Sequence, residues 1–283
     1  MSYLVAKFND ASLEEQMNQN GFIRIPDFLS YEQVSCLKDL YSQYHTSIDL
    51  QKGMWNSMYD VGAETASIIS SKILETVIPE LEKTFSSFIA PVASFMSKNP
   101  GNHGVCEFHR DFSILDESAF EYRNVWIPLI DIEQQNGALY ALKGSHKAFN
   151  YPLPMFEKWP YTNTQEKLFD FATIFSVKAG DLVVYTDRTL HGSMLNLSEK
   201  TRPVVHLGLL HPQAKIQYYH LSNNVVKVFD VPFEFYFENN FRDLEGEYPL
   251  VNKFDYSPPI ISEKELIYLN DVNLENQYLA PNE

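Results

Sequence analysis

Hydrophobic and polar residues alternate in several short stretches of the chain, and this period of two is typical of β-strands. Strands of this kind are predicted at Gly21–Pro26, Phe88–Ser97, Tyr122–Asp131, Ala138–Leu142, Leu182–Thr186 and Pro203–Leu210. In the third stretch, Trp126 falls on one face, and Val125 and Ile127 fall on the other. Because proline has no N–H to donate, Pro128 predicts that this strand is irregular or lies near a sheet edge. Many short strands separated by turn signals indicate an antiparallel sandwich or barrel.

A helical pattern precedes most of these strands. Ser30 followed three residues later by Gln33 is a capping box, so a helix is predicted to begin near Ser30 and to run to about Tyr44. A second helical pattern extends from about Ala66 to Ser87. We expect it to be broken at Pro79, because proline removes a helical hydrogen bond. The two helices are predicted to form a layer on one face of the sheet.

The composition fits a single folded domain. A length of 283 residues is ordinary for one β-barrel or sandwich, and 45% hydrophobic and 14% aromatic residues exclude a disordered chain. We divide this domain, residues 1–283, into a helical layer at about 28–87, a β core at about 88–220 and an acidic, aromatic-rich C-terminal extension at about 221–283. The sequence leaves open whether the extension covers the mouth of the barrel, forms a dimer contact or builds a satellite core.

The net charge of the chain limits the kinds of partner that it can bind. The formal net charge is −15, which argues against a nucleic-acid backbone or an anionic membrane surface as a partner. Residues 227–283 hold 12 acids and 4 bases, so 4 − 12 = −8 of that charge falls in the last fifth of the chain, as expected for a solvated acidic surface.

Cysteine usage and the lack of long apolar runs bear on location. Cys36 and Cys106 form no spacing motif and suit a reducing compartment. The N-terminus has no signal-peptide pattern, and no run approaches the roughly 18 apolar residues of a membrane span. We therefore expect a cytoplasmic protein.

Candidate chemistry begins in the segment Cys-Glu-Phe-His-Arg-Asp-Phe-Ser. In an extended backbone His109 and Asp111 point the same way, while Arg110 points the opposite way. Such a short pair is more often a simple hydrogen-bonded couple, but His191 and Arg202, eleven positions apart, follow downstream. Two imidazoles and one carboxylate that leave other metal positions open form the facial triad of non-haem Fe(II) oxygenases.

The segment between Phe149 and Phe171 interrupts the strand pattern and is rich in aromatic residues and proline. Long loops in compact domains are usually functional, so we interpret this one as a lid or pocket wall, with a packed surface crossover as the alternative. Four basic side chains could meet a substrate carboxylate but are expected to be exposed, solubilising charges: Arg110, Arg123, Lys143 and Lys147.

Several motifs occur in one order between about residues 20 and 212. They are Gly21-Phe-Ile-Arg-Ile-Pro-Asp-Phe-Leu-Ser30, His109-Arg-Asp111, Trp126-Ile-Pro-Leu-Ile-Asp131, Asn136-Gly-Ala-Leu, Gly144-Ser-His146-Lys, Gly180-Asp-Leu-Val-Val-Tyr, His191-Gly-Ser193 and Arg202. This ordered set resembles the phytanoyl-CoA dioxygenase family of Fe(II)- and 2-oxoglutarate-dependent oxygenases. The resemblance implies a mainly β protein with a double-stranded β-helix, a jelly-roll of the cupin type, beneath an N-terminal helical layer.

The resemblance also implies roles for individual residues. His109, Asp111 and His191 would ligate Fe(II), and Arg202 would form a salt bridge with the distal carboxylate of the cosubstrate 2-oxoglutarate. A guanidinium suits that task because it binds a carboxylate bidentately and stays charged. Ser193 would add a hydrogen bond to this carboxylate, and Trp126 is assigned to the same cofactor-binding set. His206 lies on the strand face of Arg202, where it either borders the cosubstrate pocket or is an ordinary core histidine.

The implied activity is that of a dioxygenase acting with O2 on a small molecule, with release of succinate and CO2. Hydroxylation of an unactivated C–H bond is favoured over halogenation, because related halogenases have a small residue where this chain has Asp111. An acidic chain disfavours an acyl-CoA substrate, and the aromatic segment favours a small apolar or amphipathic metabolite of a biosynthetic pathway. We expect a monomer or homodimer. The alternatives are a catalytically silent β-helix protein that binds a ligand, and a Zn hydrolase with the same ligands.

Overall fold

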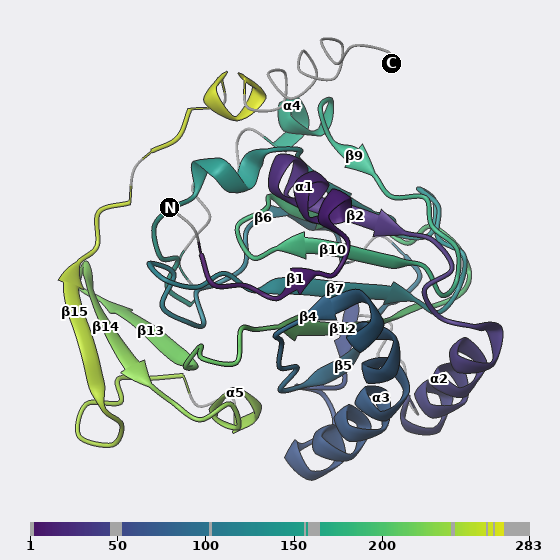
Figure 1. The fold of residues 1–283 in the computed structure, drawn as a ribbon, viewed down its shortest axis with the longest axis horizontal. Helices are drawn as coiled ribbons and strands as arrows, with labels where there is room; N and C mark the ends of the chain where they lie inside the picture. The colour runs from purple at the N-terminus through teal and green to yellow at the C-terminus, as the bar shows by residue number, and fades with distance from the viewer. Residues whose placement is uncertain are drawn as a thin grey trace.

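Two antiparallel sheets face each other in the centre of the molecule (Figure 1). The computed structural model describes residues 3–45, 53–101, 104–155, 157, 165–238, 241–258, 260–262 and 264–268. The larger sheet has the strand order β2 (Phe22–Ile25), β10 (Leu182–Thr186), β7 (Arg123–Pro128), β12 (Arg202–Leu209), β5 (Ala93–Lys98) and β3 (Met54–Asn56). The smaller sheet has the order β6 (Cys106–His109), β11 (His191–Ser193), β8 (Leu139–Ala141) and β9 (Thr173–Ile174). This arrangement confirms the predicted mainly β, jelly-roll fold.

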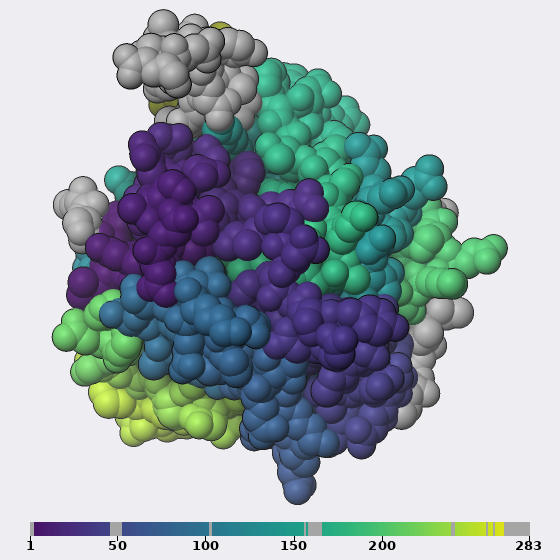
Figure 2. All heavy atoms as spheres, turned by 45° about the vertical axis from the view of Figure 1, so that its right-hand side comes forward, coloured from purple at the N-terminus to yellow at the C-terminus, as the bar shows by residue number. Residues whose placement is uncertain are grey.

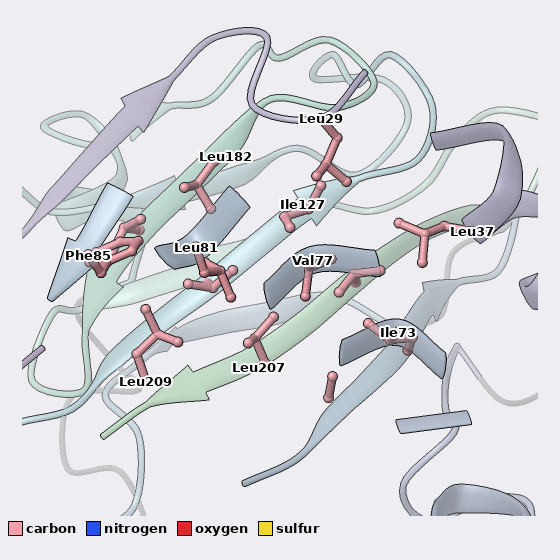
Figure 3. Close-up of a cluster of buried hydrophobic side chains, with 14 of the residues drawn as sticks. Leu29, Leu37, Ile73, Val77, Leu81, Phe85, Ile127, Leu182, Leu207 and Leu209 are labelled. Atoms are coloured by element: carbon pink, nitrogen blue, oxygen red, sulfur yellow. The ribbon is translucent and has the colours of Figure 1, made fainter. Parts of the chain in front are cut away.

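Strand alternation separates two hydrophobic cores. On β7, Val125 and Ile127 pack under the helices, whereas Trp126 faces the smaller sheet, as the alternation of that stretch predicted. Strands β10 and β12 divide their residues in the same way. Figure 3 shows the helix-side core, where Ile127 and Leu207 of the sheet meet side chains of the covering helix. The opposite face of the sheet is therefore left to line the interior of the jelly-roll.

The predicted helical layer is present, with one correction. Helix α2 (Tyr31–Tyr44) begins with the capping box: the Ser30 hydroxyl accepts a hydrogen bond from the Gln33 N–H, and the Gln33 side chain accepts one from the Ser30 N–H. Helix α3 (Ala63–Thr84) runs unbroken through Pro79, so the predicted break is wrong. A continuous buried stripe that includes Ile73 and Val77 compensates for the missing hydrogen bond.

Two further elements at the N-terminus were not predicted. Helix α1 (Ala11–Asn20) is capped by Asp10, whose side chain accepts a hydrogen bond from the Ser12 N–H, but Met17 is its one buried residue. Strand β1 (Lys7–Phe8) pairs with β4 (Phe85–Ser86). The purple and blue N-terminal part of the chain covers much of the face seen in Figure 2. Among the described residues, no helix is long and apolar enough to cross a membrane.

Strand β7 is central in its sheet, so of the two interpretations of Pro128, an irregular strand or an edge position, the edge position is wrong. It lies between β10 and β12, and Pro128 is its last residue. The pairing with β10 has already ended at Trp126, and the Pro128 carbonyl instead accepts a hydrogen bond from the Gly180 N–H. A proline at the end of a strand interrupts little of the ladder, which is why it is tolerated here.

The C-terminal part forms a third antiparallel sheet. Strands β13 (Gln217–Ser222), β14 (Val225–Asp230) and β15 (Leu250–Asp255) pair in sequence order. The short helix α5 (Phe235–Glu238) packs beside them, and Phe229 and Phe235 belong to a satellite core. In Figure 1 this sheet stands at the lower left, beside the two main sheets.

The aromatic segment lies partly outside the described residues, which omit 156 and 158–164. The 3-10 turn η1 (Ser145–Ala148) precedes the segment, and its described part contains helix α4 (Gln165–Phe169). Phe149, Tyr151 and Phe169 pack in a core on the outer face of the smaller sheet. These three residues fit the packed crossover, whereas Met155 of the same segment lines a cavity and so forms part of a pocket wall.

Candidate metal centre

Three predicted ligands meet inside the jelly-roll. His109 is the last residue of β6 and pairs directly with His191, the first residue of β11, and their ring centroids are 4.3 Å apart. Asp111 follows two residues after β6, where its N–H donates to the Asp187 carbonyl. One ligand atom from each of the three residues lies within 4.8 Å of the other two. Two imidazoles and a carboxylate at one point suit a divalent transition metal.

Backbone carbonyls set the tautomers of both histidines. His109 Nδ1 lies 2.8 Å from the Glu107 carbonyl oxygen, and His191 Nδ1 lies 2.9 Å from the Thr189 carbonyl oxygen. Because a carbonyl only accepts, each Nδ1 carries the proton, which leaves the Nε2 lone pair for a metal. Burial, and after it the neighbouring His109, lowers the pKa of His191 to about 4, so this imidazole is neutral at neutral pH.

An amide and a third imidazole hold the carboxylate in place. Asn124 Nδ2 donates to Asp111 Oδ2 at 2.6 Å, and Asn124 Oδ1 lies 3.1 Å from His206 Nε2. His191 Nε2 lies 3.9 Å from the other carboxylate oxygen, Asp111 Oδ1. One oxygen of Asp111 is thereby engaged by Asn124 and the other faces the imidazoles, so the network presents Oδ1 to a metal.

We expect Asn124→Ala to weaken metal binding by about 10- to 100-fold, the range typical for the loss of a group that orients a ligand. The cause is that Asp111 Oδ2 loses its hydrogen bond and the carboxylate gains freedom to turn. Titration of the apoprotein with Fe(II) under anaerobic conditions measures this effect. Ser94→Ala is the matched control, because Ser94 of β5 is paired with His206 of the neighbouring strand β12 and makes no described contact with Asp111. Equal metal affinity in both variants would contradict the role of Asn124.

A buried cation lies in the same interior. Arg202, the first residue of β12, is 3% exposed, and its guanidinium carbon lies 5.4 Å from the centre of the Trp126 ring. Its Nε has no hydrogen-bond partner, and among the described residues no acid forms an ion pair with it. Burial lowers the pKa of Arg202 to about 10, so it remains charged at neutral pH. A buried, unpaired guanidinium is costly unless an anion binds to it.

A second buried cation, Lys98 at the end of β5, pairs in register with Arg202. Its Nζ lies 2.6 Å from Ser193 Oγ, 3.0 Å from the Ser193 carbonyl oxygen and 2.6 Å from that of Met194. Burial, and after it the charge of Arg202, lowers the pKa of Lys98 to about 7. A carboxylate bound beside the two cations would favour the charged form of Lys98.

Two glycines allow the close packing around these groups. A Cβ on Gly192, between His191 and Ser193, would lie 2.4 Å from the Cys106 carbonyl oxygen and 2.5 Å from the Tyr140 hydroxyl. Gly137 has a φ of 89°, and a Cβ there would lie 3.0 Å from the Lys98 side chain. Only glycine fits both positions without displacing a neighbour.

The predicted site residues thus share one interior, although their functional roles stay predictions. Strand alternation also accounts for two residues that sequence reasoning missed, Asn124 and Lys98. Asn124 has the parity of Trp126, and Lys98 has that of Met96, so both are polar residues at inward positions of buried strands. Polarity at such a position was the available signal.

Two basic residues expected at the surface are buried instead. Arg110 and Arg123 are each 1% exposed, and each forms an ion pair with a glutamate. Arg110 pairs with Glu117 at 2.5 Å, and Arg123 pairs with Glu14 of α1 at 2.7 Å. Arg123 thereby joins β7 to α1, whereas among the described residues no acid pairs with Arg202.

A jelly-roll with two imidazoles and one carboxylate at one point of its interior defines the class of non-haem iron oxygenases. The chain belongs to the phytanoyl-CoA dioxygenase (PhyH) family, whose model matches residues 17–204. This match confirms the resemblance found in the ordered motifs.

Two curated plant proteins are similar over part of the chain. A phytanoyl-CoA dioxygenase from Arabidopsis thaliana is 30% identical over 122 residues, which are 38% of this chain and 39% of that protein. Phytanoyl-CoA dioxygenase 1 from Oryza sativa subsp. japonica is 28% identical over 130 residues, which are 41% of this chain and 42% of that protein. The matched part of the chain therefore spans about two fifths of the length of these relatives.

Two solved structures have a similar fold. SnoK, a non-haem, α-ketoglutarate-dependent carbocyclase from nogalamycin biosynthesis, has a TM-score of 0.52 and 18% identity, over 71% of this chain and 84% of that one. HygX from Streptomyces hygroscopicus, solved with nickel, 2-oxoglutarate and hygromycin B bound, has a TM-score of 0.52 and 17% identity, over 70% of this chain and 87% of that one. At these identities the similarity shows the shared fold.

Proposed function

We propose that this protein is an Fe(II)- and 2-oxoglutarate-dependent dioxygenase that oxidises an unactivated C–H bond of a small molecule. The observation that carries the proposal is the meeting of His109, Asp111 and His191 in an interior that also holds the unpaired guanidinium of Arg202. A Zn hydrolase would use the same three ligands but would leave the buried cation without a purpose. A silent ligand-binding protein would have no need of two imidazoles aimed at one carboxylate.

The residues present fit the implied metal and cosubstrate. His109, Asp111 and His191 would hold Fe(II), and Arg202 would pair with the distal carboxylate of 2-oxoglutarate above the ring of Trp126. Bound together, Fe(II) and 2-oxoglutarate supply the oxidation of a C–H bond by O2, with release of succinate and CO2. The chain itself orients these groups, and apolar residues between the two sheets, among them Val183 and Val204, exclude water from them.

Absorbance spectroscopy tests the proposal directly. Under anaerobic conditions, the apoprotein with Fe(II) and 2-oxoglutarate is expected to develop the weak visible charge-transfer band of the iron chelate. Succinate release on exposure to O2 and substrate is then expected to depend on both additions. Iron binding without the band, or without any succinate, would overturn the proposal in favour of the hydrolase or the silent protein.

The proposed cellular location and assembly of the protein each have one supporting observation. Cys36 and Cys106 are free thiols, which supports a reducing compartment such as the cytoplasm. Each of the three site ligands and Arg202 comes from the same chain, which supports a site that is complete in one protomer, whether the protein is a monomer or a homodimer.

A further inference from the structure

A cavity of about 240 Å³ lies directly beside the metal centre. Asp111, Asn124 and His206 form its inner end, so a molecule in the cavity would reach the carboxylate side of the three ligands. On the larger sheet its lining continues through inward residues such as Met96 and Gly208. The cavity is therefore part of the same interior as the proposed oxidation site.

Part of the cavity wall comes from the chain that follows the residues matched by the family model. The match ends at residue 204, whereas Leu210, Phe233 and Tyr236 line the cavity. Tyr236 is held in place by a 2.6 Å hydrogen bond from its hydroxyl to the Gln217 carbonyl oxygen. Helix α5 and the loop before it thus close a site whose metal ligands lie in the family core.

The lining contains no basic residue. Among the described residues around the cavity none is Lys or Arg, and the one acid is the predicted ligand Asp111. His206 is neutral there, because burial lowers its pKa. The remaining surface is mostly aromatic and aliphatic, with the methionines Met58, Met96 and Met155 among its members. An anionic substrate in this cavity would lose its hydration without gaining a counter-charge.

The volume limits the size of the substrate. At about 240 Å³ the cavity lies just below the roughly 300–1,000 Å³ of pockets that hold drug-sized ligands. The nucleotide and phosphates of a coenzyme A thioester would have to remain outside this space, and they would find no cation in its lining. A molecule of roughly 8 to 15 non-hydrogen atoms fits it.

We propose that the substrate of the oxygenase is a compact, uncharged and mainly apolar molecule, enclosed by the C-terminal segment from Leu210 to Tyr236. This inference rests on the proposed function, because it places the reacting C–H bond beside that metal centre. The substrate class differs from an acyl-CoA, although the family takes its name from one.

Gly208 provides a test of where the substrate lies. This residue lines the cavity from β12, and a Cβ there would meet Leu210 and Tyr122 at ordinary contact distances of 3.6 and 3.7 Å. Gly208→Ala and Gly208→Val therefore fill the cavity in steps, and valine is well suited to a strand. Neither change touches the metal ligands or Arg202.

The experiment uses the full chain loaded with Ni(II) and 2-oxoglutarate, which does not turn over, and measures ligand binding by NMR. The probes are 1-naphthol and indole as uncharged compounds, 1-naphthoate as a matched anion, and octanoyl-CoA. We expect the uncharged probes to bind at least about tenfold more tightly than the anions. Gly208→Val is expected to weaken the binding of the uncharged probes by about tenfold or more, and Gly208→Ala should have an intermediate effect.

Three outcomes would overturn the inference. They are preferred binding of 1-naphthoate or octanoyl-CoA, binding of the uncharged probes that Gly208→Val does not weaken, and no binding of any uncharged probe. The proposed function is judged separately by the Fe(II) chelate band, which needs no substrate. A protein that forms the band but prefers anions keeps its proposed function and loses this substrate class.

A different observation carries a second inference, about the orientation of Ser193. Lys98 is fully buried, and its ammonium has three oxygens within 3.0 Å. Two of them are carbonyl oxygens, so the third N–H is donated to Ser193 Oγ at 2.6 Å. A hydroxyl that accepts from an ammonium keeps its own O–H available for donation to another group. Among the described residues none accepts that proton.

We infer that Lys98 is a positioning residue that turns the Ser193 hydroxyl into a donor for the distal carboxylate of 2-oxoglutarate. Arg202 lies opposite Lys98 in the strand register, and the Gly137 Cβ position lies within 3.4 Å of both side chains. The carboxylate would therefore meet the guanidinium and the oriented hydroxyl together. This inference also rests on the proposed function.

A double-mutant cycle on 2-oxoglutarate affinity tests it. Lys98→Met and Ser193→Ala are each expected to raise the dissociation constant about 10- to 100-fold, the usual effect of losing a charge-assisted hydrogen bond, with Fe(II) affinity unchanged. The double variant should be no weaker than the weaker single variant, because Lys98 acts through Ser193. Lys98→Gln, which keeps an N–H donor without the charge, should recover most of the affinity and also guards against misfolding.

Two results would overturn the inference, because each would mean that Lys98 acts through its charge. One is that the losses of 2-oxoglutarate affinity add in the double variant. The other is that Lys98→Gln loses as much affinity as Lys98→Met. A wild-type protein that binds no 2-oxoglutarate at all would instead contradict the proposed function.

Discussion

Asp111→Ala is expected to abolish 2-oxoglutarate turnover. The variant removes one of the three ligand atoms that lie within 4.8 Å of one another, and His109 and His191 alone would hold Fe(II) weakly. In structural zinc sites about 10–16 kcal/mol of binding is shared among four ligands, so loss of one ligand here is expected to cost on the order of 3 kcal/mol, or about 100-fold in metal affinity.

Succinate release and anaerobic Fe(II) titration measure this effect together. Glu107→Ala is the matched control, because it also removes a carboxylate from this segment but its side chain is exposed. Full turnover in Asp111→Ala would show that the carboxylate is not a ligand. Loss of turnover in both variants would indicate damage to β6 and not to the metal centre.

Arg202→Ala is expected to raise the dissociation constant of 2-oxoglutarate while leaving iron binding unchanged. A carboxylate that loses a buried charged partner is destabilised by about 2–5 kcal/mol, which corresponds to about 30- to 5,000-fold in affinity. Arg202→Lys keeps the charge but loses the bidentate geometry, so it should fall between wild type and alanine. Turnover of the alanine variant should recover partly at high 2-oxoglutarate concentrations.

The chelate band, titrated with 2-oxoglutarate at fixed Fe(II), gives the dissociation constant. Lys200→Ala is the matched control, since Lys200 is an exposed cation two residues before Arg202. If Arg202→Ala binds 2-oxoglutarate as wild type does, the assignment of the buried guanidinium to the cosubstrate is wrong. A simultaneous loss of Fe(II) binding would point to a structural role for Arg202.

Central strands were the most predictable part of the fold. Leu182–Thr186 has the same bounds as predicted, and Val125 and Ile127 lie on the predicted side of β7, because both faces of these strands are buried in separate cores. Helix α1 was missed because one buried residue, Met17, leaves no hydrophobic stripe to detect. The unbroken α3 depends on tertiary burial that outweighs the local effect of Pro79.

The candidate site also has a part that the sequence predicts and a part that it does not. Motif spacing was enough to predict which residues gather around the metal position, because His109 and His191 end and begin strands that pair directly. The partners of those residues depend on contacts between distant segments, which no local pattern encodes. Lys98 reaches Ser193 across 95 positions, and Asn124 meets His206 across 82.

The wall formed by Phe233 and Tyr236 has an evolutionary consequence. These residues come after the family core, so mutations in them can change which molecule is accepted without disturbing the iron ligands. Substrate selectivity could then change during evolution while the oxidation chemistry at the metal centre stays the same, as in enzymes whose loops vary on a constant scaffold. Exchange of this C-terminal segment between relatives is therefore a rational route to new substrates for the same oxidation chemistry.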